Sequence, residues 1–312
     1  MSRIRIATLV AALLVALAAL VAACGGSEEP TSPAALVTDS LKAVREQKPI
    51  RYRFNVQART DEVVPAPGAG EDVRRLAQSP LALGLSGGYS PEALEAKGNA
   101  QYGGQTFTAD ALAGPRELYV RFLGQWYGTK ETGLDDLRRQ AESRSGRSSD
   151  QAFDQALRSI ERQGPRVFRG EVTEGPELDG TSTWQTQGTL NAQGLEQIAR
   201  EQGQQVTAND RRALEQLARA TRLTYIVGQD DQLPRRIRLS LDLRPQDLAQ
   251  SAREQGRQLR QLERLRASLT ADMSAWGEEV ELRPPGRFQP LEQLLQQFLG
   301  GGAGGGAVPQ PG

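Results

Sequence analysis

The sequence predicts one α+β domain, in which about eight to ten antiparallel strands alternate with short amphipathic helices. Three observations lead to this fold class. Residues 50–58 alternate between apolar and polar side chains, as a half-buried antiparallel strand does. Residues 222–243 contain two alternating segments around a Gly-Gln-Asp-Asp turn, which is typical of a β-hairpin. Apolar side chains at helical spacing precede the first strand, within residues 36–44.

The first elements are expected to be a helix, a strand and a loop. Ser32 as N-cap and Pro33 at the first helical position predict the start of a helix, which ends at Lys48 and Pro49. The strand at 50–58 follows. Residues 59–79 are charged and rich in Pro, Ala and Gly, which predicts a long loop.

Further strands are expected at 81–89, 94–104, 105–114 and 116–129, separated by Gly-Gly and Gly-Pro turns. The last of these segments has apolar side chains on both faces. Leu118, Val120 and Phe122 share one face, while Tyr119 and Leu123 lie on the other. A strand of this kind must be covered on both sides, by helices or by a ligand.

The second half of the chain is expected to return to helices and then to hairpins. Helices are predicted from Leu134, from a Ser149 cap to Ile160, and after caps at Asn191 and Thr207. Residues 166–174 and 180–191 predict a hairpin. Leucines at helical spacing predict a polar helix over 245–270, followed by a strand at 278–284 and a helix at 290–299.

Composition excludes several classes of protein. The chain has 312 residues, no His, one Cys, and 38 basic against 38 acidic side chains. Without His the commonest general base and metal ligand is missing, and one Cys forms no internal disulfide. A neutral chain with few aromatic residues is not expected to bind nucleic acid. No nucleophile or phosphate-binding motif is present, so we expect neither an enzyme nor a cofactor.

The N-terminus predicts a lipoprotein signal peptide over residues 1–23. Arg3 and Arg5 precede an apolar run from Ala7 to Ala23, and the run ends in Val-Ala-Ala-Cys. This pattern matches the bacterial lipobox, in which Cys24 is acylated and becomes the first residue of the mature chain. The alternative is an uncleaved signal anchor whose terminal Cys has no role. Both interpretations place the remaining chain on the extracytoplasmic face of the cell membrane.

The mature chain divides into three parts. Residues 24–35 form a flexible polar tether, residues 36–299 a single domain, and residues 300–312 a Gly-rich tail that is expected to be disordered. We see no residue-level repetition between the two halves of the domain. We expect a monomer.

Four sequence segments, and their order along the chain, resemble the actinobacterial lipoproteins of the LppX/LprAFG type, which are relatives of the LolA and LolB carriers. They are the lipobox with its tether, "SLKAVREQKPIRYRFNVQA", "GQTFTADALAGPRELYVRFLGQWYG" and "WGEEVELRPP" before the final helix. The resemblance implies a curved antiparallel half-barrel with helices covering its concave face. It also implies an apolar cavity for the acyl chains of a lipid or glycolipid.

Residues that would line such a cavity are Tyr52, Phe54, Val120, Phe122 and Trp184, on the apolar faces of their strands. Two other functions stay open. One is a structural or interaction lipoprotein of the cell envelope, in which the same side chains form an ordinary packed core. The other is an extracytoplasmic hydrolase that uses the carboxylates at 135–136 or 230–231, although such acidic pairs are usually turns or helix caps.

Overall fold

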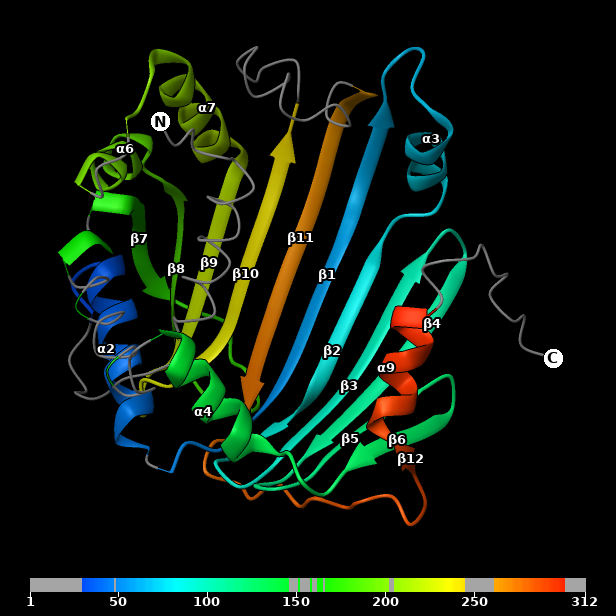
Figure 1. Cartoon of the computed structure of the whole chain (residues 1–312). Coiled ribbons are helices and arrows are strands. Elements are labelled where there is room, and N and C mark those ends of the chain that lie inside the picture. The colour runs from blue at the N-terminus through cyan, green and yellow to red at the C-terminus, as the bar shows by residue number, and fades with distance from the viewer. Residues whose placement is uncertain are drawn as a thin grey trace.

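The computed structural model describes residues 30–47, 49–145, 151, 158, 162–164, 166–201, 205–244 and 261–300. These residues form an α+β fold built on one open sheet of twelve strands (Figure 1). The strand order is β12-β6-β5-β4-β3-β2-β1-β11-β10-β9-β8-β7, and every pair is antiparallel except β12 with β6. Within these ranges no helix combines the length and the apolar character needed to cross a membrane.

The strands are β1 (Tyr52–Pro65), β2 (Ala82–Tyr89), β3 (Leu94–Tyr102), β4 (Gln105–Ala113), β5 (Leu118–Phe122), β6 (Gln125–Thr129), β7 (Phe168–Glu174), β8 (Thr183–Leu190), β9 (Thr221–Gly228), β10 (Pro234–Leu243), β11 (Leu262–Ser274) and β12 (Gln289–Pro290). The helices are α2 (Pro33–Glu46), α3 (Glu71–Gln78), α4 (Leu134–Ser145), α6 (Ala192–Glu201), α7 (Ala208–Ala220) and α9 (Leu291–Gly300).

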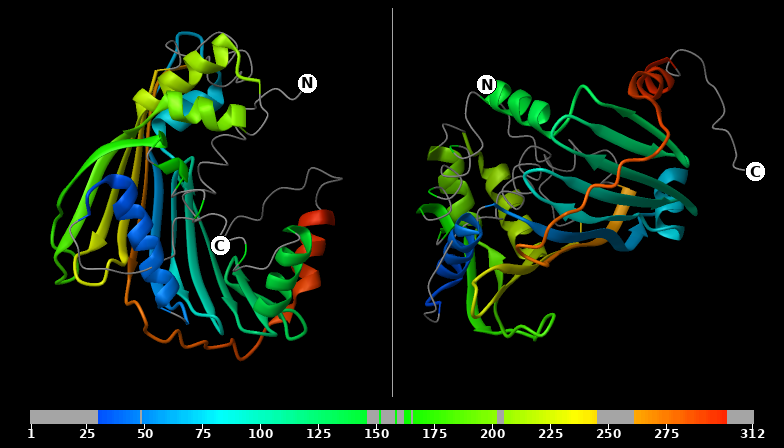
Figure 2. Two further views of the ribbon diagram at one scale, coloured as in Figure 1. Left: turned by 90° about the vertical axis from the view of Figure 1, so that its left-hand side faces the viewer. Right: turned by 90° about the horizontal axis from the view of Figure 1, so that it is seen from below.

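The sheet has an apolar and a polar face, because each strand alternates between the two and the register keeps like residues in line. We call the face that carries Phe54 and Ile237 the inner face and the opposite face, with Arg53 and Arg236, the outer face. Figure 2 shows that the sheet is strongly curved around its inner side. Helix α2 lies beside β7–β10, and α4 and α9 lie at the β6 end of the sheet.

Most of the predicted elements are confirmed. Helix α2 begins after Ser32, whose Oγ accepts a hydrogen bond from the Ala35 N–H at 3.1 Å. The two hairpins form as antiparallel pairs, β7 with β8 and β9 with β10. Thr207 caps α7 through a capping box with Asp210. The segment 116–129 forms two strands, β5 and β6, which turn at Leu123 in a left-handed conformation (φ 49°).

Three predictions are wrong. The region 59–79 is not a loop: β1 continues to Pro65, and α3 follows. Residues 262–270 belong to strand β11, which pairs with both β1 and β10, and not to a helix. Residues 278–284 are extended but pair with no strand; Val280 and Leu282 instead lie close to Gly88 and Gly114.

Several predictions fall outside the described residues. They are the signal peptide, Cys24, most of the tether, the helix from Ser149 to Ile160, the helical pattern over 245–260 and the Gly-rich tail beyond Gly300. These remain predictions from the sequence.

Candidate functional site

The inner face divides into two regions, which differ in how much the rest of the chain covers them. We call the part on β8–β11, under helix α2, the covered region. We call the part on β2–β4 the open region. Both belong to one continuous sheet, so the difference comes from the inner side chains and from what packs on them.

The covered region is a packed core. Leu36 on α2 is fully buried against Tyr225, Val227, Ile237 and Met273, each of which exposes less than 5% of its surface. Tyr225 also donates or accepts a hydrogen bond with Ser40 of α2, with 2.7 Å between the hydroxyl oxygens. Burial raises the pKa of the Tyr225 hydroxyl, so it stays protonated across the physiological range. Helix α2 is thereby fixed on these strands by apolar packing and one buried polar contact.

The open region has three exposed leucine or phenylalanine side chains, and Tyr102 on β3 is also an inner residue and is 42% exposed. Leu83 and Leu85 on β2 and Phe107 on β4 expose 45%, 44% and 41% of their surfaces. All three occupy inner positions in the register. Large apolar residues on the inner side of a curved sheet are normally covered, and contiguous exposed apolar surface is typical of a binding site.

Between these side chains the inner face is made of small residues. The small-residue floor consists of Gly87, Ala96, Gly98, Ala100, Ala109 and Ala111. One row of the sheet runs from Phe54 through three of them to Val120. The ends of that row are four strand spacings apart, about 19 Å. The next row runs from Val56 through Leu85, Gly98 and Ala109 to Phe122.

The sequence-predicted residues separate between the two regions. Phe54, Val120 and Phe122 stand at the margins of the small-residue floor and are half-buried. Tyr52 stacks on Trp276, with 5.1 Å between ring centroids, and belongs with Trp184 to the margin of the covered region. All five lie on the inner face, but the structure does not gather them into one site.

The second face of β5 is covered at Tyr119 but not at Leu123, and the cover on Tyr119 does not come from a helix. Tyr119 is fully buried on the outer face and meets Phe288 edge-on, with 5.0 Å between centroids. Its hydroxyl donates to Glu117 Oε2 at 2.8 Å. Burial and the adjacent carboxylate raise the pKa of Tyr119 to about 12. Leu123 is 64% exposed in the β5–β6 turn.

The small-residue floor carries no ionisable side chain, so the open region offers apolar surface and no acid or base. The carboxylates considered for hydrolysis make local contacts. Asp136 accepts from the Gly133 N–H at 3.1 Å, and Asp231 from the Leu233 N–H at 2.9 Å. In the described part of the chain no three His, Cys, Asp or Glu side chains gather in a way that could hold a metal ion.

Leu83, Leu85 and Phe107 are functional candidates that the sequence interpretation missed. A signal was present: Gly and Ala alternate with polar residues through 95–101 and 108–112. Together these small residues leave space above the sheet. Their exposure depends on where the helices lie, and the strand pattern does not determine that.

Comparisons with known proteins give a likeness in structure and none in sequence. No protein-family model matches the chain, and no curated protein is similar to it in sequence. The crystal structure of LprF from Mycobacterium bovis aligns with 83% of this chain and 99% of its own, at 12% identity and a TM-score of 0.35. A TM-score of this size does not establish a shared fold, so the resemblance expected from the sequence stays a prediction.

Proposed function

We propose that the chain is an extracytoplasmic lipoprotein that binds the acyl chains of a lipid or glycolipid above its small-residue floor. In this proposal the curved sheet acts as a LolA-like half-barrel, anchored at the cell membrane through acylated Cys24. The observation that carries it is the exposure of Leu83, Leu85 and Phe107 on the inner face of a curved sheet.

The chemistry of the open region suits a flexible apolar ligand. Small residues allow an acyl chain to approach the strand backbones, while Leu85 and Phe107 provide contact at its sides. At Gly98 an ideal Cβ would be only 3.3 Å from the Ala109 carbonyl oxygen, so glycine keeps the side chain off the sheet surface at this position. Each methylene removed from water contributes about 0.8 kcal/mol. Binding of this kind needs no catalytic group and no cofactor, and a single chain is enough for it.

The direct test is to identify what the protein carries. The chain is purified from a lipid-containing host and denatured, and the extract is examined by mass spectrometry. We expect about one diacyl or triacyl lipid per chain, together with uptake of a fluorescent fatty-acyl probe after delipidation. Protein that is free of lipid and fails to take up the probe would refute acyl binding.

The anchor has its own test. A Cys24→Ser variant is expected to lose the acyl mass and the cleavage that depends on it. Wild-type protein that is membrane-bound but carries no added acyl mass would contradict the lipobox interpretation.

A second function, a structural or interaction lipoprotein without a ligand, is favoured by the covered region. There α2 fills the inner face with the protein's own side chains, as Leu36 does at full burial. The lipid analysis separates the two functions, since a self-filled domain contains no lipid and excludes the probe.

A further inference from the structure

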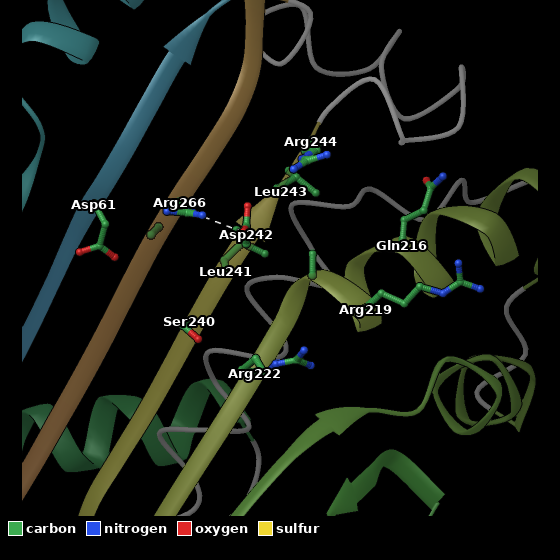
Figure 3. A pocket seen from close by; sticks show the side chains of 12 residues that line it. Asp61, Gln216, Arg219, Arg222, Ser240, Leu241, Asp242, Leu243, Arg244 and Arg266 are labelled. Atoms are coloured by element: carbon green, nitrogen blue, oxygen red, sulfur yellow. Dashed lines mark hydrogen bonds and ion pairs between the residues drawn. The ribbon is translucent and has the colours of Figure 1, made fainter.

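A pocket of about 680 Å³ lies where the C-terminal end of α7 meets β9, β10 and β11 (Figure 3). Its volume is within the range of small-molecule sites. Arg222, Ser240, Asp242 and Arg266, which line it, occupy outer positions in the strand register. Its lining also includes Leu241, Leu243 and Ala267, which occupy inner positions, so residues of both faces border the pocket. None of its lining residues belongs to the small-residue floor.

The two carboxylates of the pocket are already neutralised. Asp242 accepts from Arg264 at 2.9 and 2.7 Å and from Arg266 at 3.3 Å. These two guanidinium groups lower the pKa of Asp242 to about 2. Glu62, 3.3 Å from Arg266, completes a balanced group of two acids and two bases. Asp61 forms a separate pair with Arg59 at 2.7 Å.

Three other arginines of the pocket have no such partner. Arg219, Arg222 and Arg244 line the pocket, are exposed, and form no ion pair with any acid in the described ranges. In Figure 3 Arg244 lies at the end of β10, and Arg222 and Arg219 lie on the side of β10 where α7 is. Among the described residues, these three positive charges beside the Ser240 hydroxyl have no acidic partner.

The chain holds two of these arginines at a fixed junction. Arg219 is in the last turn of α7, and Arg222 is the second residue of β9. Thr221 between them is 2% exposed, and its Oγ1 donates to the Leu217 carbonyl at 2.8 Å. The backbone positions from which these two side chains extend are therefore fixed relative to each other.

We infer that this pocket binds a phosphate group, held by Arg219, Arg222 and Arg244. A phosphate carries the negative charge that three guanidinium groups compensate and the oxygens that their N–H groups and the Ser240 hydroxyl can reach. The group can belong to a soluble phosphate or to the head group of a phospholipid. The inference does not depend on acyl binding, since no residue that lines the pocket belongs to the small-residue floor.

The test is isothermal titration calorimetry of the full-length chain in detergent. Two probes are titrated at constant ionic strength: inorganic phosphate and monomeric dihexanoyl-phosphatidylglycerol. Arg219→Gln/Arg222→Gln is compared with Arg238→Gln, an exposed outer-face arginine on β10 that does not line the pocket. Circular dichroism establishes that each variant is folded.

We expect the double variant to bind at least one probe about tenfold more weakly or worse, and Arg238→Gln to bind it as the wild type does. If the double variant loses binding of inorganic phosphate, the ligand is a soluble phosphate. If it loses binding of the lipid alone, the ligand is a phospholipid head group. An equal loss in Arg238→Gln, or no binding of either probe by the wild type, would overturn the inference. Lipid binding that is as tight in Arg219→Gln/Arg222→Gln as in the wild type would also overturn it, while leaving the acyl-binding proposal intact.

Discussion

The covered and open regions of the inner face are two parts of one sheet that use opposite residue types. On β9–β11 the inner positions hold Tyr225, Ile237 and Met273, which α2 buries. On β2–β4 they hold alanines and glycines, and the leucines among them stay exposed. The first arrangement fills the concave side with protein, and the second leaves it available.

The difference shows that burial on a sheet face depends on which helix lies over it. Both regions alternate between inner and outer side chains, and both pair in regular antiparallel register. Stability and ligand binding are therefore expected to be located in different strands. The first two of the following predictions compare the two regions, and the third concerns the outer side of the covered region.

The largest effect is expected from removing a side chain at the centre of the covered region. Leu36→Ala creates a cavity among fully buried neighbours and should lower the free energy of unfolding by about 2–5 kcal/mol. Leu85→Ala removes the same atoms from a 44% exposed position and should change it by less than about 0.5 kcal/mol. Urea denaturation measures both. Equal losses would mean that Leu85 is part of the packed core.

A smaller effect is expected from the buried hydroxyl pair. Tyr225→Phe leaves Ser40 Oγ buried without its 2.7 Å partner and should cost about 1–3 kcal/mol. Tyr102→Phe is the matched change at the end of β3, where the side chain is 42% exposed, and should be neutral. Adding Ser40→Ala to Tyr225→Phe should recover part of the loss. No loss in Tyr225→Phe would show that the pair does not fix α2.

The smallest effect concerns the ion pairs on the outer side of the covered region. The pKa of Asp242 is about 2 in the folded chain, below the value of about 3.9 for an unfolded one. Its contribution is therefore fully present above about pH 4 and is lost as the pH falls toward 2. Because Asp242 is half exposed, solvent screening keeps this contribution small. Asp242→Asn should reduce the slope of unfolding free energy against pH in that range, and an unchanged slope would contradict the assignment.

Local patterns in the sequence predict the hairpins, the capped helices and the alternation of β1, because each depends on neighbouring residues. Strand β11 was interpreted as a helix because Leu262, Leu265 and Leu269 have helical spacing. If alanine is counted as apolar, the same segment also alternates between apolar and polar residues, because Ala267 and Ala271 lie between larger inner residues. Pairing on both sides, with β1 and β10, decides between the two patterns, and such long-range contacts are not visible locally.

The candidate site was predictable only in part. Phe54, Val120 and Phe122 were identified from the apolar faces of their strands, and they border the small-residue floor. The floor itself and the exposed Leu83, Leu85 and Phe107 were not identified. Residues close in sequence do not determine the register that aligns Gly98 with Ala109. They also do not determine that α2 lies over β9–β11 and leaves β2–β4 uncovered.

The central claim is that the open region holds an acyl chain, and one pair of variants tests it directly. Ala109→Phe places a ring on the small-residue floor, whereas Thr108→Phe places the same ring one residue away on the outer face. Uptake of a fluorescent fatty-acyl probe is measured for both after urea denaturation has shown unchanged stability. We predict that Ala109→Phe loses most of the uptake and that Thr108→Phe keeps it. Equal uptake by the two variants would contradict the account.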